Sequence, residues 1–245
     1  MVFTEQLNNS NTIIMRIGGF QKISLIDYPE HLSSIIWTPT CNFRCPFCYN
    51  KDLVLGNVGL FSEDEVLQTL KERQGKIEAV VITGGEPTLQ KDLKDFIKKI
   101  KALNYLVKLD TNGTNPDILE TLLNEKLLDY VAMDIKAPKD KYQTLTGVNK
   151  SHLKDVESSI EIIKNLAPDY EFRTTIVPGL LNKDDILSIA QWLSGSRRYI
   201  LQQFTIPGEL IDKNLVKSRP YPREFFDDLK SVIKDYFMSC EIREF

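Results

Sequence analysis

The stretch Ser34-Ile-Ile-Trp-Thr-Pro-Thr-Cys-Asn-Phe-Arg-Cys-Pro-Phe-Cys48 decides both the fold and the chemistry of this chain. The apolar run at its start predicts a buried strand. Three cysteines follow that strand in one loop, Cys41, Cys45 and Cys48, and the rest of the sequence contains one more, Cys240. Three thiolates this close together repel one another and tolerate burial poorly, so the loop predicts a site for a metal ion or a metal cluster.

The number of ligands separates two kinds of metal site. A structural zinc ion is closed by four ligands, so zinc would need a fourth from Cys240, His31 or His152. At a cubane iron–sulfur cluster, three cysteines bind three irons and leave the fourth iron open to another ligand. The spacing CxxxCxxC, with the aromatic Phe47 before the last cysteine, favours the cluster. Zinc is the alternative.

Composition limits the class of protein. A chain of 245 residues with 42% hydrophobic content can bury one core of barrel size. The net charge of −3 gives no broad basic field, which argues against nucleic acid or anionic lipid as a partner. The apolar runs are far shorter than the roughly 20 residues of a membrane helix, and residues 1–12 are polar rather than a signal sequence. We therefore expect a cytoplasmic protein, where thiols stay reduced.

Strand-like and helix-like segments alternate from residue 34 onward. Strands are expected at 34–39, 77–83, 105–110, 129–135, 170–178 and 199–204. Helices are expected at 63–73, 91–102, 116–126, 152–166, 184–193 and 222–237. Six βα units in series predict an α/β fold with a parallel sheet. A partial (β/α)6 TIM-like barrel is the natural closure, and a six-stranded doubly wound sheet is the alternative.

We expect a single domain over residues 1–245. An N-terminal extension (1–33) holds a short extended hairpin that turns at Gly18-Gly19, the core spans 34–237, and a C-terminal tail covers 238–245. Ser62 with Glu65 three residues later predicts a capping box on the first helix.

Polar clusters follow the ends of the expected strands. They are Thr83-Gly84-Gly85-Glu86-Pro87, Asp110-Thr-Asn-Gly113, Asp134-Ile-Lys136, Arg173-Thr-Thr-Ile-Val-Pro-Gly179 and Gln202-Gln203-Phe204. The carboxyl ends of parallel strands share one edge, where α/β proteins build their active sites. We therefore expect these clusters and the cysteine loop to form one site, and this convergence favours the barrel.

The residue types in these clusters suit a charged ligand. Gly84-Gly85 lets backbone approach a ligand closely and present free N–H and C=O groups to an amino acid. Asp110 and Asp134 could share a cation or bind a ribose hydroxyl. Lys136 and Arg173 could neutralise a carboxylate, Arg173 in bidentate fashion. Strand-end turns, helix caps and solvated charges are the alternatives.

With these motifs in hand, the chain resembles the radical S-adenosylmethionine (radical SAM) superfamily, through CxxxCxxC and Gly84-Gly85-Glu86. Within it, the chain is similar to the glycyl-radical-enzyme activases. It is most similar to the anaerobic ribonucleoside-triphosphate reductase activating proteins, with pyruvate formate-lyase activating enzyme as a relative. The likeness runs through Gly18 to Pro29, Cys48-Tyr-Asn50, Asp110 to Gly113, Asp134 to Lys136, Leu145-Thr-Gly-Val148 and Thr175 to Gly179.

The resemblance implies a barrel of the radical SAM type, a [4Fe-4S] cluster on Cys41, Cys45 and Cys48, and SAM as second cofactor. It assigns to the SAM site Phe47, Cys48, Tyr49, Gly85, Asp134, Ile135 and Lys136. The strand-end clusters add Gly84, Glu86, Asp110, Thr111, Asn112 and Arg173 as candidates for cofactor binding. Lys136 and Arg173 join the cysteines as catalytic candidates. A monovalent cation is implied near Asp110, Thr111 and Asp134.

The implied reaction is reductive cleavage of SAM, followed by removal of a hydrogen atom from a glycine of a large partner enzyme. The implied partner is the catalytic subunit of an anaerobic ribonucleotide reductase, with flavodoxin or ferredoxin as electron donor. Tyr49 departs from the pattern, since these activases usually have histidine there. Two alternatives stay open: a small-molecule radical SAM enzyme such as 7-carboxy-7-deazaguanine synthase, which also carries GGEP, and a non-catalytic zinc-binding interaction protein.

Overall fold

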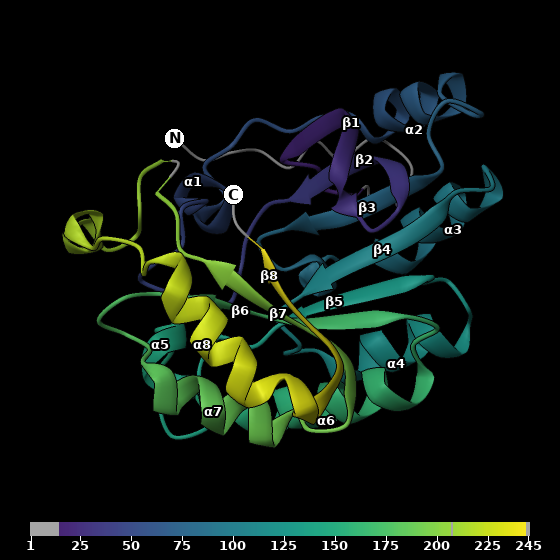
Figure 1. Cartoon of the computed structure of the whole chain (residues 1–245). Helices are drawn as coiled ribbons and strands as arrows, with labels where there is room; N and C mark the ends of the chain where they lie inside the picture. The colour runs from purple at the N-terminus through teal and green to yellow at the C-terminus, as the bar shows by residue number, and fades with distance from the viewer. Residues whose placement is uncertain (1–14, 207, 244–245) are drawn as a thin grey trace.

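The computed structural model describes residues 15–206 and 208–243 and contains one eight-stranded sheet (Figure 1). The strands are β1 Gly19–Tyr28, β2 His31–Thr38, β3 Ala79–Gly84, β4 Leu106–Thr111, β5 Tyr130–Asp134, β6 Tyr170–Ile176, β7 Ser196–Gln203 and β8 Phe237–Arg243. The helices are α1 Lys51–Leu55, α2 Glu63–Glu72, α3 Leu93–Ala102, α4 Pro116–Asn124, α5 Tyr142–Thr146, α6 Leu153–Leu166, α7 Lys183–Trp192 and α8 Arg223–Ile233. Short 3₁₀ helices span Pro87–Leu89, Lys213–Lys217 and Lys234–Tyr236.

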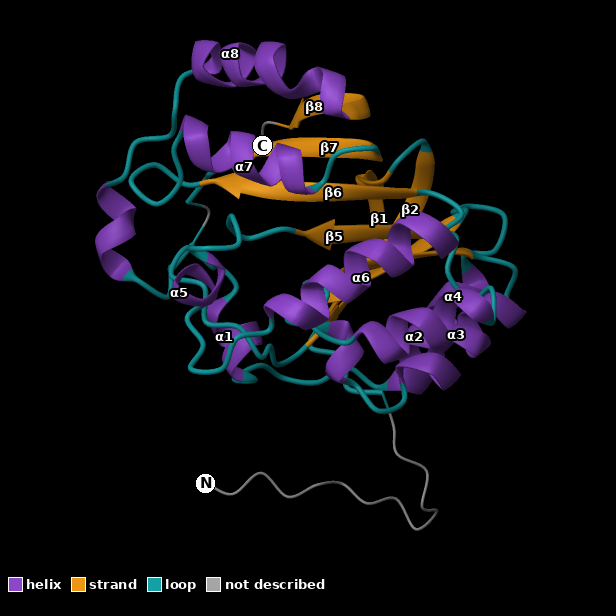
Figure 2. Ribbon diagram, turned by 90° about the horizontal axis from the view of Figure 1, so that it is seen from below, coloured by secondary structure: helices purple, strands orange, loops and turns teal. Residues whose placement is uncertain are grey.

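The order of the strands in the sheet is their order in the sequence. β2 to β8 are parallel, and β1 is antiparallel to β2. A doubly wound sheet reverses its strand order, whereas sequential order with right-handed crossovers puts all helices on one side. Figures 1 and 2 show the helices on the outer side of a curved sheet whose edges, β1 and β8, do not pair. The partial barrel is confirmed, and the doubly wound alternative is wrong.

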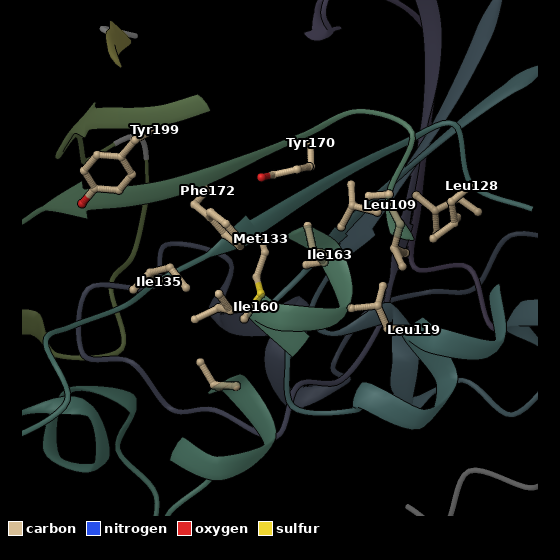
Figure 3. Close-up of a cluster of buried hydrophobic side chains, with 14 of the residues drawn as sticks. Leu109, Leu119, Leu128, Met133, Ile135, Ile160, Ile163, Tyr170, Phe172 and Tyr199 are labelled. Carbon is tan, nitrogen blue, oxygen red and sulfur yellow. The ribbon is translucent and has the colours of Figure 1, made fainter. Parts of the chain in front are cut away.

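The two faces of the sheet differ in chemistry. The outer face packs against the helices through an apolar core, and Figure 3 shows part of it, with Met133 and Phe172 of the sheet facing Ile160 and Ile163 of α6. The inner face has a small apolar cluster near the amino ends of the strands, which includes Tyr130. Toward the carboxyl ends the inner face becomes polar and charged. One strand can be apolar on its outer face and polar on its inner face, because strand residues alternate between the two faces.

The N-terminal hairpin lies elsewhere than the sequence suggested. β1 begins at Gly19, directly after a bend at Gly18, and pairs with β2. The hairpin turns at Pro29-Glu30, where Glu30 has φ 66°. A Cβ on Gly18 would lie 2.8 Å from the Leu53 side chain. The hairpin turn is therefore not at Gly18-Gly19 as expected; the chain only bends at Gly18, where close packing leaves no room for a side chain.

Two further local predictions fail. Residues 237–243 form β8, so the expected tail (238–245) contains a strand, and residues 244–245 lie outside the described part. The burial of residues along β8 does not alternate regularly, and Met238 is 83% exposed. The segment therefore carries no clear strand pattern. Ser62 makes no side-chain cap, whereas Asn182 and Asp185 form a capping box at α7.

A buried ion pair ties β8 to the interior of the sheet. The Glu171 side chain on β6 is 1% exposed, and its two oxygens lie 3.1 and 3.0 Å from the guanidinium of Arg243 on β8. The Tyr130 hydroxyl donates a third hydrogen bond to Glu171, at 3.1 Å. Burial alone would raise the pKa of Glu171, but Arg243, Arg173 and Lys108 together lower it. Glu171 is therefore ionised and depends on its cations.

Arg243→Met should lower the free energy of unfolding by about 3 kcal/mol, because it removes one partner of a buried charge pair. Urea denaturation monitored by circular dichroism measures the change. Lys183→Met is the control, since its ion pair with Asp228 joins exposed side chains and should contribute less than about 1 kcal/mol. Equal stability of the Arg243 variant and the wild type would show that Glu171 does not need this cation.

Candidate cluster and cofactor site

The cysteine loop starts at the carboxyl end of β2 and is held by α1. Thr40 takes a left-handed conformation with φ 71°, which turns the chain out of the strand. Its N–H donates to the carbonyl of Leu53 at 2.8 Å, and the Cys41 N–H donates to Val54 at 3.2 Å. These two hydrogen bonds fix the backbone path at the start of the loop.

The helix α5 holds the middle of the loop from the other side. The Arg44 N–H donates to the carbonyl of Thr146 at 2.8 Å. Gly147 follows with φ 64°, and a Cβ there would lie 2.5 Å from the Arg44 carbonyl oxygen. The Phe43 ring packs between the rings of Tyr142 and His152. In the sequence, Gly147 is part of the Leu145-Thr-Gly-Val148 resemblance, which gave it no role.

The Gly84-Gly85-Glu86 segment at the end of β3 contacts the same loop. The Gly85 N–H donates to Thr38 at 2.9 Å and the Glu86 N–H to Thr40 at 2.8 Å. A Cβ on Gly85 would lie 1.8 Å from the Thr40 carbonyl oxygen. The expectation of a free N–H group is wrong at Gly85, because its N–H and that of Glu86 bond the end of β2 and the start of the cysteine loop.

The Glu86 carboxylate connects β3 to β4. It is fully buried and accepts hydrogen bonds from the N–H and hydroxyl of Thr88, the Thr111 hydroxyl at 2.8 Å and the Asn112 N–H at 2.7 Å. Burial raises the pKa of Glu86, while these four donors lower it in part. The Glu86 side chain, which the sequence predicted at the SAM site, thus joins the ends of β3 and β4.

The Asn112 side chain extends this hydrogen-bond network to Cys41. Its side-chain N–H₂ lies 3.8 Å from the Cys41 sulfur and donates to the Asn42 side chain at 2.9 Å. The Phe43 N–H points at the same sulfur from 3.4 Å. Hydrogen bonds to cluster sulfurs are one of the means by which proteins set a reduction potential. Asn112 is therefore placed to influence any centre bound at Cys41.

Burial controls the protonation of two of the thiols. It raises the pKa of Cys41 to about 11, with a further increase from the Glu86 charge. It raises the pKa of Cys45 to about 12, although the Lys136 cation acts in the opposite direction. Burial thus favours the protonated thiols, and a cationic centre bound there would have to replace their protons.

Four charged side chains from adjacent strands meet beside the loop. The Arg173 Nε lies 2.8 Å from Asp134, and its NH1 lies 3.3 Å from Asp110. Lys136 Nζ lies 3.0 Å from Asp134. Burial would raise the pKa of Asp134, but Arg173 and Lys136 lower it well below its usual range. The structure thus brings together Asp110, Asp134, Lys136 and Arg173, as the sequence predicted.

The donor set fits an iron–sulfur cluster. Within residues 15–206 and 208–243, no three His, Cys, Asp or Glu side chains converge on a point where they could hold one metal ion. A cubane cluster can be held by three cysteines on three irons, which is the number of thiols that this loop supplies. The residues considered as a fourth zinc ligand contact other groups: His31 contacts Glu78, His152 contacts Asp155, and Cys240 is buried on β8.

The remaining candidates occupy different surroundings. Phe47 is buried under the loop. The Ile135 side chain lies in the apolar core on the outer face (Figure 3). Tyr49 is 51% exposed and lines a hollow of about 400 Å³ with Lys51 and Glu209. Tyr49 is therefore the aromatic group of this loop that a binding partner could reach.

The family model named Radical SAM superfamily matches residues 35–193, which include the second half of β2, the cysteine loop and β3 to β6. The chain belongs to the radical SAM superfamily. Its members use a [4Fe-4S] cluster and SAM, so the chain is an enzyme with these cofactors. Cys41, Cys45 and Cys48 are the residues that would hold the cluster.

Two proteins of Methanocaldococcus jannaschii are similar to this chain. Both are named as candidate glycyl-radical enzyme activating enzymes. One is 34% identical over 232 residues, which covers 93% of this chain and 95% of the relative. The other is 30% identical over 184 residues, 72% of this chain and 68% of the relative. A Pyrococcus horikoshii protein named as a candidate GTP 3′,8-cyclase is 29% identical and is covered over 65% of its length.

Among solved structures, Streptococcus suis SuiB matches with a TM-score of 0.65 at 14% identity. The match covers 86% of this chain and 48% of SuiB, so this chain spans about half the length of that protein. The structure of SuiB bound to S-adenosylmethionine matches with a TM-score of 0.63. At this identity the likeness supports the fold. In the part of the chain that the structure describes, no helix is long and apolar enough to cross a membrane.

Gly147→Ala should reduce the iron content after anaerobic reconstitution, because the new Cβ meets the Arg44 backbone inside the cysteine loop. Gly195→Ala is the matched control: Gly195 also has a left-handed φ of 81°, but a Cβ at this position would find no neighbouring atom within 4 Å. Each variant bears the left-handed strain of roughly 1 kcal/mol. Iron analysis and cluster absorbance should separate them, and equal iron content would contradict the role given to Gly147.

Asn112→Asp should lower the reduction potential of the cluster, because an N–H donor near Cys41 becomes a carboxylate. A redox titration followed by electron paramagnetic resonance (EPR) measures the potential. Thr114→Val is the control, since it removes a hydroxyl that contacts Asn42 and Asn112 but has no contact with Cys41 of its own. An unchanged potential in Asn112→Asp would show that its amide does not act on the cluster.

Proposed function

We propose that this chain is a glycyl-radical-enzyme activase, and that its partner is the catalytic subunit of an anaerobic ribonucleoside-triphosphate reductase. The observation that carries the proposal is the similarity to the first M. jannaschii relative over nearly the whole length of both chains. The motif resemblance, including Thr175 to Gly179 on and after β6, supports the choice of partner.

The residues around the loop have distinct tasks in this proposal. Cys41, Cys45 and Cys48 would hold the [4Fe-4S] cluster, which, when bound and reduced, would supply the electron for cleavage of SAM. Arg173 and Lys136 provide cationic groups for the carboxylate of SAM. Asp110 and Asp134 keep these cations oriented, since both carboxylates bond Arg173. Glu86 and Gly85 keep the cysteine loop against the ends of β3 and β4.

The arrangement of the described strands and helices supports a substrate that is supplied by another protein. Each of β1 to β8 belongs to the one sheet, and the helices α2 to α8 of residues 15–206 and 208–243 cover or border it. No separate substrate domain is found in this part of the chain. A glycine in an extended loop of a partner suits such a site, because it has no side chain to keep its Cα away from C5′ of SAM.

The proposed chemistry needs an electron donor and a reducing compartment. Reduction of the cluster needs a low-potential donor, and we propose flavodoxin or ferredoxin. A cytoplasmic location follows from the same chemistry, because free thiols and a reduced cluster need a reducing compartment.

The test combines the reconstituted protein, SAM, a reductant and the large reductase subunit under anaerobic conditions. A glycyl-radical doublet should appear in the EPR spectrum of the partner, and substitution of the glycine in its radical loop by Ala should remove it. Arg173→Ala should reduce the doublet far more than it reduces the iron content. Lys183→Ala, a surface cation away from the loop, should leave both unchanged.

Two results separate the proposal from its alternative. SAM cleavage without a doublet on the reductase or any other glycyl radical enzyme would contradict the activase assignment. Turnover of a small molecule such as a pterin under the same conditions would favour the small-molecule class. A GTP 3′,8-cyclase, the name given to the Pyrococcus horikoshii relative, is an enzyme of that class.

A further inference from the structure

The charged side chains of the inner face follow a regular pattern on three neighbouring strands. β4 carries Lys108 and Asp110, β6 carries Glu171 and Arg173, and Asp134 at the end of β5 is followed by Lys136. In each case an acid and a base stand two residues apart, so both point to the same face. The strands β4, β5 and β6 are adjacent, which places the pairs side by side.

This pattern gives each oxygen of Asp110 and Asp134 a side-chain cation. Asp110 Oδ1 lies 2.6 Å from Lys108 Nζ, and its Oδ2 lies 3.3 Å from Arg173. Asp134 Oδ1 lies 2.8 Å from Arg173, and its Oδ2 lies 3.0 Å from Lys136. Three cations thus surround two carboxylates.

The third residue expected beside a monovalent cation is also engaged. The Thr111 hydroxyl donates to Glu86 at 2.8 Å and accepts from the Gly113 N–H at 3.1 Å. An inorganic cation binds through several oxygen ligands at once. Here those oxygens face protein cations, and a further positive charge would be repelled by all three. The residues present therefore do not fit the monovalent cation that the resemblance implied.

Lys108 is the least expected member of this group. Its side chain is 3% exposed, and its ammonium lies over the ring of Tyr130 at 5.9 Å as well as on Asp110. A lysine is almost never buried without such partners. Burial would raise the pKa of Asp110, but Arg173 and Lys108 lower it, so the carboxylate is ionised.

We propose that the Lys108 ammonium, with the Arg173 guanidinium, takes the place of an inorganic monovalent cation in this chain, so that SAM binding does not depend on potassium or sodium. Lys108 is a positioning residue: together with Arg173 it keeps Asp110 charged and fixed beside the SAM site. This inference concerns SAM binding alone and is independent of the glycyl radical partner.

The experiment measures SAM affinity of the anaerobically reconstituted protein by equilibrium dialysis, in potassium chloride, sodium chloride or choline chloride of equal ionic strength. The wild type should bind SAM with the same affinity within about twofold in all three salts. Lys108→Met should bind SAM about tenfold more weakly in choline chloride, since Asp110 loses a buried partner, and recover in potassium or sodium chloride. Methionine keeps most of the volume of the lysine stem.

A control and a second readout make the outcome specific. Lys101→Met removes the same type of charge from another Lys–Asp pair, in which Lys101 on α3 lies 2.7 Å from Asp129, and should show no dependence on the salt. Thallium-205 resonance of protein with the oxidised, diamagnetic cluster reports cation binding directly. It should broaden with Lys108→Met and stay sharp with the wild type.

Two results would overturn the inference. A wild type that loses SAM affinity in choline chloride or broadens the thallium resonance binds an inorganic cation, and this measurement does not depend on the folding of any variant. Lys108→Met with unchanged affinity in all salts would show that the ammonium does not replace a cation.

Discussion

The buried carboxylate of Glu86 is the interaction on which the site depends. A fully buried carboxylate is unfavourable unless every lone pair finds a donor, and here the donors come from the 3₁₀ turn after β3 and from Thr111 and Asn112 at the end of β4. The Glu86 N–H also bonds the Thr40 carbonyl, one residue before Cys41. One residue therefore fixes two strand ends and the cysteine loop relative to one another.

Glycine has a complementary task at two points around the same loop. Gly85 and Gly147 each bring backbone against backbone, at Thr40 and at Arg44, where a Cβ would collide. The loop is thus held from β3 on one side and from α5 on the other. A cluster that must present one open iron to SAM needs such a rigid frame, because orientation is the contribution of the protein to cofactor chemistry.

Much of this could be predicted from sequence, for physical reasons that differ by residue. The six strands and the joint position of Asp110, Asp134 and Arg173 follow from hydrophobic runs and from the shared edge of parallel strands. β8 could not be predicted in this way, because its burial pattern is irregular and its stability comes from pairing with β7 and from Arg243 on Glu171. The contacts of Gly85 and Gly147 join residues far apart in the chain, so local sequence carries no sign of them. Lys108 was missed because a lysine in a strand usually faces solvent.

The central claim is that three cysteines hold a cluster whose open iron receives SAM. The most direct measurement is electron–nuclear double resonance of the reduced protein with SAM carrying ¹⁵N in its amino group. We expect a ¹⁵N coupling to the cluster that disappears in Cys45→Ala and persists in Cys240→Ala. A reduced cluster that shows no ¹⁵N coupling, or purified protein that contains zinc without iron, would contradict it.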